Sequence, residues 1–209
     1  GGGGKTTLLR VLGEELAEQG HTVLLCTTTR LYPFPGLAAL YSPSEDALRR
    51  LLQSHRIAAA GTPVPGTGKL TAPDLPMERL AALAEYVLVE ADGSAGRPMK
   101  AHASHEPVIP PETGQTILVM GASGFGQPIA QAAHRPERYA RLAGVSPDAR
   151  ITPEIASRVL LAENLHDRVY VNQVETPEQV TAAGRLKNLL RCPVLGGELR
   201  KERRHLSCW

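Results

Sequence analysis

The chain has 209 residues, of which 42% are hydrophobic and 4% aromatic, so one sizeable domain with an aliphatic core is expected. A net charge of +2 argues against a dedicated nucleic-acid binder, and three cysteines without a C-x-x-C pair are too few for a disulfide scaffold. No apolar run approaches the roughly 20 residues that cross a bilayer and no signal peptide is visible, so a cytoplasmic protein without a membrane partner is expected.

Helices and strands alternate along the predicted chain. In order they are a helix at 6–20, a strand at 21–29, a helix at 42–54, a strand at 57–61, a helix at 75–84, a strand at 85–93, a strand at 115–126, helices at 135–144 and 152–165, a strand at 167–175, a helix at 176–191 and a strand at 192–199. Ser42 or Ser44 would cap the second helix, and Pro136 and Pro153 suit first-turn positions. This order predicts a three-layer α/β fold with a mostly parallel sheet and helices on both faces, in a single domain over 1–209.

The opening stretch GGGGKTT fits the end of the phosphate-binding motif G-x-x-x-x-G-K-[ST]. In such a P-loop the glycine N–H groups wrap the phosphates, the lysine reaches the β- and γ-phosphates, and the next hydroxyl binds Mg²⁺. The residues expected to contact a nucleotide here are Gly1, Gly2, Gly3, Gly4, Lys5, Thr6 and Thr7. The motif's first glycine, and the strand that normally leads into it, would lie before residue 1. The alternative interpretation is a glycine linker in front of an ordinary helix.

The strand VLVEADGS, residues 87–94, ends in two acidic residues. An apolar strand that ends in a carboxylate is typical of the Walker-B position, where the carboxylate holds Mg²⁺ directly or through water. Asp92 is the first choice for this ligand and Glu90 the second, with Thr6 as the P-loop ligand. Gly93 would let the backbone approach the γ-phosphate. The alternative is an Asp–Gly turn without function.

Two further segments lie at the ends of predicted strands, where ligands bind in open α/β sheets. In CTTTRLYP, a threonine such as Thr28 would position Mg²⁺ or the attacking water, or the run serves strand formation alone. In VNQVE, Asn172 would hydrogen-bond a purine edge, as in a relaxed N-K-x-D motif, or would only cap a strand end.

The segment RPMKAHASHEP carries cations before a group of His and Glu residues. Arg97 and Lys100 would meet an anionic ligand. His102, His105 and Glu106 could ligate a transition metal, but the set of ligands is incomplete, so contact with substrate or protein, or a structural role in the loop, is favoured.

GGGGKTTLL, TTTRLYP, LVEADGSAGRPMKAHASHEPVIP, HRPE and VNQVE occur in this order, and together they resemble the YqeC-like family of the P-loop NTPase superfamily. The resemblance spans nearly the whole chain and is most specific in the block around ADGSAGRPMK. It implies a nucleotide-binding accessory protein that helps to mature selenium-dependent molybdenum hydroxylases. The site residues that it implies are Lys5, Thr6, Asp92, Gly93, Arg97, Lys100, His105 and Glu106. Gln and Glu in NQVE depart from the GTPase pattern, so the choice between ATP and GTP stays open.

These observations lead to one functional hypothesis and two alternatives. The chain would bind ATP or GTP with Mg²⁺ and hydrolyse it, with Lys5, Asp92 and Thr28 in catalytic positions and a protein client of the hydroxylase machinery as partner. One alternative is a small-molecule kinase or nucleotidyl transferase that acts on a cofactor precursor. The other is a cofactor-binding module without turnover.

Overall fold

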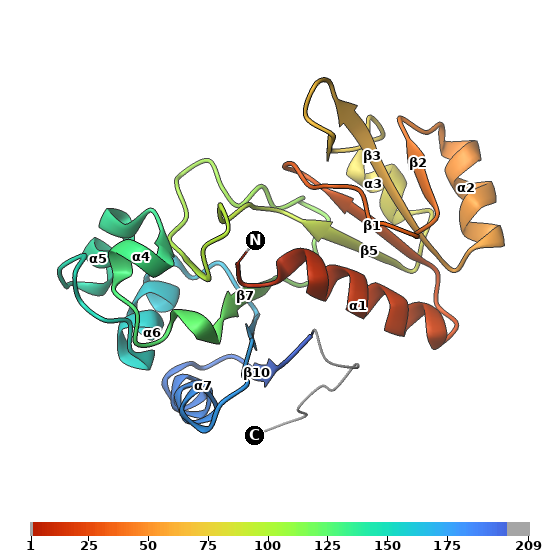
Figure 1. Ribbon diagram of the computed structural model, residues 1–209. Helices are drawn as coiled ribbons and strands as arrows, with labels where there is room; N and C mark the ends of the chain where they lie inside the picture. Colours follow the sequence, from red (N-terminus) through yellow and green to blue (C-terminus); the bar gives the residue numbers. More distant parts are fainter. Residues whose placement is uncertain (1, 200–209) are drawn as a thin grey trace. The chain divides into compact units, whose positions relative to one another are not determined.

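The computed structural model describes residues 2–199, in which helices alternate with mostly parallel strands (Figure 1). The helices are α1 Lys5–Glu18, α2 Glu45–Ser54, α3 Met77–Ala81, α4 Ile129–Ala132, α5 Pro136–Ala143, α6 Pro153–Glu163 and α7 Pro177–Leu189, with a 3₁₀ turn at Ala122–Gly124. The strands are β1 Val23–Thr27, β2 Ala39–Tyr41, β3 Ile57–Val64, β4 Lys69–Thr71, β5 Tyr86–Glu90, β6 Met99–Lys100, β7 Ile117–Gly121, β8 Ala133–His134, β9 Arg168–Asn172 and β10 Val194–Gly197. The predicted α/β class is therefore confirmed. No helix in this part of the chain is both long and apolar enough to cross a membrane.

The described chain forms two compact units, each made of separate segments. Unit 1 comprises residues 2–5, 94–104 and 114–199, and unit 2 comprises residues 6–93 and 105–113. The chain therefore passes between the units after residues 5, 93, 104 and 113. The prediction of a single domain stays a prediction.

Unit 2 is built on a sheet with the order β2-β3-β1-β5, in which all neighbours are parallel, and β4 pairs antiparallel with β3. The central strand β1 is buried along its whole length because it carries consecutive apolar residues. Val23 and Leu25 share a cluster with Leu9 and Leu16 of α1. The alternate residues Leu24 and Cys26 share a second cluster with α2 and α3. Since successive side chains point to opposite faces of a strand, this sheet is covered on both faces.

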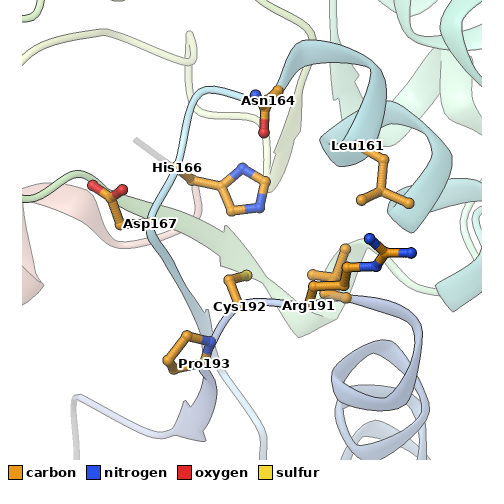
Figure 2. Close-up of a pocket in the computed structure, with 8 residues that line it drawn as sticks. Leu161, Asn164, His166, Asp167, Arg191, Cys192 and Pro193 are labelled. Carbon is orange, nitrogen blue, oxygen red and sulfur yellow. The ribbon is translucent and has the colours of Figure 1, made fainter.

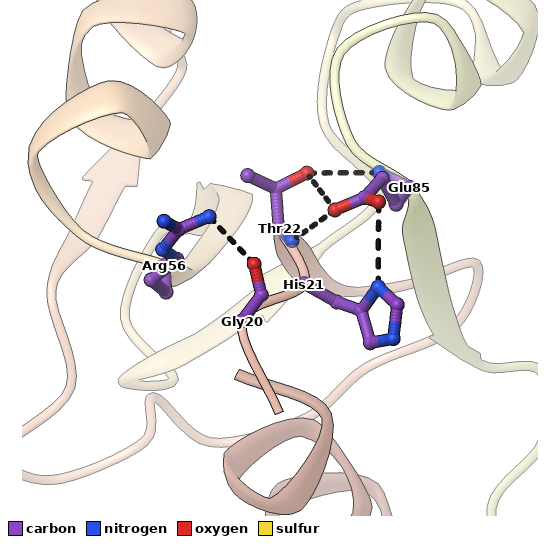
Figure 3. Close-up of polar contacts among 5 residues, drawn as sticks. All are labelled: Gly20, His21, Thr22, Arg56 and Glu85. Atoms are coloured by element: carbon purple, nitrogen blue, oxygen red, sulfur yellow. Dashed lines mark hydrogen bonds and ion pairs between the residues drawn. The ribbon is translucent and has the colours of Figure 1, made fainter. Parts of the chain in front are cut away.

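A polar clasp joins the beginnings of β1 and β5 (Figure 3). The Thr22 N–H donates to Glu85 Oε2 at 2.7 Å, and the Glu85 N–H donates in turn to Thr22 Oγ1 at 3.1 Å. His21 Nδ1 lies 3.3 Å from Glu85 Oε1, and its ring meets Tyr86 edge-on. The hydrogen bond from the Thr22 backbone is the main cause that lowers the pKa of Glu85, and the hydrogen bond with His21 lowers it further. The clasp fixes the register that places Thr27 opposite Glu90 at the other end of the pair.

Unit 1 is built on a parallel sheet with the order β10-β9-β7, and β6 pairs with β8 beside it. Its core joins Val169 and Val171 of β9 to buried residues of four helices. One buried residue from each helix is Ile129 of α4, Tyr139 of α5, Val159 of α6 and Leu186 of α7. Burying these largely apolar side chains supplies the main favourable contribution to the stability of this unit.

Local sequence signals account for the helix starts. Ser44 caps α2 by accepting the Ala47 N–H, whereas Ser42, the other expected cap, lies before it at φ 48°. Pro136 and Pro153 occupy first-turn positions as expected. Thr176 forms a full capping box with Gln179 at the start of α7.

Five short elements were absent from the sequence-based expectation, namely β2, β4, β6, β8 and α4. Each has two to four residues, too few to show a hydrophobic period. The strand expected at 57–61 is also longer, because β3 runs on to Val64 to pair with β4. Conversely, the strand expected at 115–126 ends at Gly121 and gives way to the 3₁₀ turn.

Candidate functional site

The glycine run is packed against other segments of unit 1. A Cβ atom on Gly2 would lie 2.1 Å from the Gly96 carbonyl oxygen, and one on Gly4 would lie 2.1 Å from Asn172 Nδ2. Gly4 also has φ 87°, in the region that only glycine enters at little cost. Gly1, which was predicted to bind nucleotide, lies outside the described residues. From Gly2 to Gly4 the chain is thus a close-fitting turn, in contrast to a free linker.

Helix α1 begins directly after this turn, at Lys5. A helix start leaves backbone N–H groups without partners inside the helix and carries the positive end of the helix dipole, an arrangement that favours phosphate. Thr7, in the first turn, is exposed. The sequence GGGGKTT therefore has the turn-to-helix context that a phosphate-binding motif needs.

Within unit 2, the hydroxyl of Thr6 and the carboxylate of Glu90 lie together. Thr6 Oγ1 donates to Glu90 Oε2 at 2.5 Å, across 84 residues of sequence. Glu90 is only 7% exposed, at the end of β5. A short O–H···O⁻ bond of this length is charge-assisted. Of the two predicted acidic ligands, the second choice is the one that contacts Thr6.

Thr27, the last residue of β1, and Thr28, directly after it, form hydrogen bonds with neighbouring segments. Thr27 Oγ1 donates to the Glu90 carbonyl at 2.7 Å and accepts the Thr29 N–H at 3.0 Å. Thr28 Oγ1 donates to the Val108 carbonyl at 2.6 Å, while the Val108 N–H donates to the Ala91 carbonyl. The segment 105–113 is thereby tied to the carboxyl ends of β1 and β5. In this structure, the Thr28 hydroxyl predicted for catalysis holds that segment.

The other predicted residues of the acidic strand end and the following segment are spread over both units. In unit 2, Asp92 is 8% exposed and Gly93 has open space where a Cβ would be. In unit 1, Arg97 donates to the Gln131 carbonyl, and Lys100 belongs to β6.

His105 is exposed and Glu106 is half-buried, both in unit 2. No group of three or more His, Cys, Asp or Glu side chains suited to a metal ion occurs in residues 2–199.

Asn172, the last residue of β9, and Gln173, directly after it, hold the glycine run. Asn172 Nδ2 donates to the Gly3 carbonyl at 3.2 Å, and its Oδ1 accepts the Leu199 N–H at 3.2 Å. Gln173 Nε2 donates to the Gly2 carbonyl at 3.1 Å. The structure thus gives the Asn172 amide protein partners at both polar atoms. Sequence reasoning placed Gln173 at the lysine position of the relaxed N-K-x-D motif and did not predict its contact with Gly2, which lies 171 residues away.

A buried histidine–carboxylate pair was also missed. His102 Nδ1 lies 2.8 Å from Glu163 Oε2, and the His102 N–H donates to Glu163 Oε1 at 2.6 Å. Both side chains are at most 9% exposed. The pair anchors the segment 94–104 to the end of α6, and Glu163 adds to the burial that raises the pKa of Tyr139.

A cavity of about 340 Å³ in unit 1 lies where β9 and β10 begin (Figure 2). It is lined by Leu161, Asn164, His166, Asp167, Leu190, Arg191, Cys192 and Pro193. Figure 2 shows the His166 ring between Asn164 and Cys192. Burial lowers the pKa of His166 and raises that of Cys192, so both are neutral near pH 7. None of these lining residues is a predicted site residue. Asn172, which is one, lies at the other end of β9.

The fold and the site define an α/β protein with mostly parallel sheets, in which a packed glycine turn leads into a helix. Residues 1–137 match the model of the YqeC protein family. The chain therefore belongs to the YqeC family. The uncharacterized protein YqeC of Escherichia coli strain K12 is 31% identical over 166 residues, which are 72% of this chain and 61% of that protein's length. No solved structure matches the chain.

Proposed function

We propose that this protein binds a purine nucleoside triphosphate with Mg²⁺ through residues 2–7 and the end of β5. The observation that carries the proposal is the contact between Thr6 Oγ1 and Glu90 Oε2 at 2.5 Å. The hydroxyl that follows the lysine of a G-K-T sequence and a carboxylate that ends a buried strand are the two oxygen donors that a P-loop site needs. Their closeness supports a shared function for two motifs that are far apart in sequence.

The donor chemistry fits magnesium. Mg²⁺ prefers oxygen ligands and is usually held by one or two protein groups together with phosphate oxygens and water. Thr6 and Glu90 would hold the ion, and the bound ion would neutralise charge on the phosphates. Lys5 would add a positive charge beside the β- and γ-phosphates. Asp92, two residues beyond Glu90 and also buried, would orient water on the ion.

Binding is tested by titrating the purified protein with ATP and GTP, with and without Mg²⁺, in a calorimeter. Lys5→Ala should remove the Mg²⁺-dependent binding, while Lys187→Ala, which removes a lysine from the last turn of α7, should leave it intact. Binding that is equal in wild type and Lys5→Ala, or absent from wild type, contradicts the proposal.

We further propose that the bound triphosphate is hydrolysed and that the protein serves the maturation of a selenium- and molybdenum-dependent hydroxylase. Support for this role comes from the block ADGSAGRPMK and the other motifs that resemble the YqeC-like family. Steady release of phosphate without an acceptor is expected. A phosphorylated or nucleotidylated small product would instead indicate a transferase, and binding without turnover would indicate a cofactor-binding module. In cells that lack the protein, hydroxylase activity should return with wild type and not with Lys5→Ala.

A further inference from the structure

Two neighbouring amide side chains hold two successive carbonyl groups of the glycine run. Gln173 Nε2 donates to the carbonyl of Gly2, and Asn172 Nδ2 donates to the carbonyl of Gly3. Both donors lie at the end of a single strand, β9, with Asn172 as its last residue and Gln173 directly after it, and the buried residues Val169 and Val171 fix this strand in the core of unit 1. The glycine turn is therefore attached to a rigid element at two consecutive peptide groups.

The direction of each amide group is determined by its second partner. Asn172 Oδ1 accepts from the Leu199 N–H, which can only donate, so Nδ2 must face the Gly3 oxygen. Gln173 Oε1 accepts from the Ser123 hydroxyl at 2.7 Å, which leaves Nε2 for the Gly2 oxygen. Neither amide can rotate by half a turn without placing two oxygen atoms against each other.

Holding the carbonyls also sets the direction of the neighbouring N–H groups. In a trans peptide the C=O and N–H bonds point in opposite directions. The Gly3 and Gly4 N–H groups therefore point away from Gln173 and Asn172, and they donate no hydrogen bond to any residue in the range 2–199. Gly4 has φ 87°, and a left-handed residue in a turn is a feature of backbone nests that bind anions.

We infer that Asn172 and Gln173 are positioning residues that orient the Gly3 and Gly4 N–H groups toward the phosphates of the ligand, so that neither side chain reads the base. The inference rests on the proposed nucleotide binding. Gln173 itself has φ 61°, a backbone conformation that costs energy in a residue other than glycine. In this conformation the Gln173 side chain reaches the Gly2 carbonyl.

The two roles of Asn172 predict different ligand profiles. A base reader contributes only to ligands that carry the base. A residue that orients the phosphate-binding N–H groups contributes equally to ATP, to GTP and to inorganic tripolyphosphate, which has no base. Loss of one orienting hydrogen bond should weaken each of the three by the same factor, roughly three- to tenfold.

The test compares wild type with Asn172→Ala, Gln173→Ala and the matched control Asn188→Ala, which shortens an exposed asparagine of α7 in the same unit. Dissociation constants for Mg²⁺-ATP, Mg²⁺-GTP and Mg²⁺-tripolyphosphate are measured by calorimetry at a temperature at which circular dichroism shows every variant to be folded. The expected result is the same loss for all three ligands in the first two variants and no change in the control. Gln173 is only half-buried, so its variant provides the test even if Asn172→Ala does not fold.

Unchanged constants in a folded variant, with wild type binding normally, overturn the positioning role alone. A loss for one nucleotide without any loss for tripolyphosphate overturns it in favour of base reading. If wild type binds none of the three ligands, the proposed function fails, and the positioning role fails with it.

Discussion

Replacing Thr6 by valine removes one hydroxyl and keeps the shape of the side chain. The lost bond joins Thr6 Oγ1 to Glu90 Oε2 at 2.5 Å, and Glu90 is 7% exposed, so water replaces the donor only poorly. A hydrogen bond to a charged group contributes about 1.5–3 kcal/mol to stability. We therefore expect Thr6→Val to lower the free energy of unfolding by about this amount in the absence of Mg²⁺ and nucleotide.

The control is Thr6→Ser, which keeps the hydroxyl and loses a partly exposed methyl group, for a cost below about 0.8 kcal/mol. Urea unfolding at pH 7, followed by far-ultraviolet circular dichroism, gives the free energy from the midpoint and slope of each transition. With Mg²⁺ and ATP or GTP added, Thr6→Ser should retain the Mg²⁺-dependent gain in stability and Thr6→Val should lose it. If valine proves no more destabilising than serine, the bond to Glu90 does not supply this stability.

Three further predictions concern pH and the glycine turn. Burial raises the pKa of Cys26 from 9.0 to about 12, so the stability that the protonated thiol adds is complete below pH 9 and is lost as the pH rises toward 12. In urea titrations between pH 8 and 10, the free energy of unfolding of wild type should fall by about 1.4 kcal/mol more than that of Cys26→Ala. Equal losses in the two proteins would contradict this. The Thr22 N–H lowers the pKa of Glu85 below 4.5, so the stability that Glu85 adds is present above pH 4.5 and is lost as the pH falls through the folded-state pKa. The difference in free energy of unfolding between wild type and Glu85→Gln should therefore shrink on acidification. A difference that stays constant with pH would exclude this linkage. Gly4→Ala should destabilise the protein by more than about 1 kcal/mol because Gly4 has φ 87° and a Cβ there would contact Asn172. Gly184→Ala, on α7 where a Cβ has free space, should stabilise the protein slightly. The same shift in melting temperature in both variants would argue against the packed turn.

The sequence alone predicts most of the regular structure, because hydrophobic patterning is local. The run Val23–Thr27 has to be a buried strand, and a cap such as Thr176 fixes where a helix starts. The strands β6 and β8, which pair with each other, escape prediction because two residues are too few to show a hydrophobic period. Each strand finds its partner only in the folded chain. The division of the chain into two units escapes prediction for a related reason, since each unit is assembled from separate segments whose contacts form only in the folded chain.

The site is predictable to the extent that each residue sits at the end of a recognisable element. Thr6 follows a glycine–lysine pair and Glu90 ends an apolar strand, and these positions bring the two side chains together. Asn172 was also found at a strand end, but the motif could not reveal that its amide meets the Gly3 carbonyl and the Leu199 N–H. Both of those contacts depend on tertiary pairing, and the residue type alone fits a base-reading role equally well.

The bond between the Gly3 carbonyl and Asn172 spans 169 residues, and this distance has a consequence for biosynthesis. At roughly 5–20 residues per second, the ribosome reaches Asn172 roughly 10–30 s after it has made Gly3. During that interval the glycine turn lacks the two amide partners that hold it in the folded chain. The segment that we propose to hold phosphate would therefore be synthesised well before it becomes competent for binding.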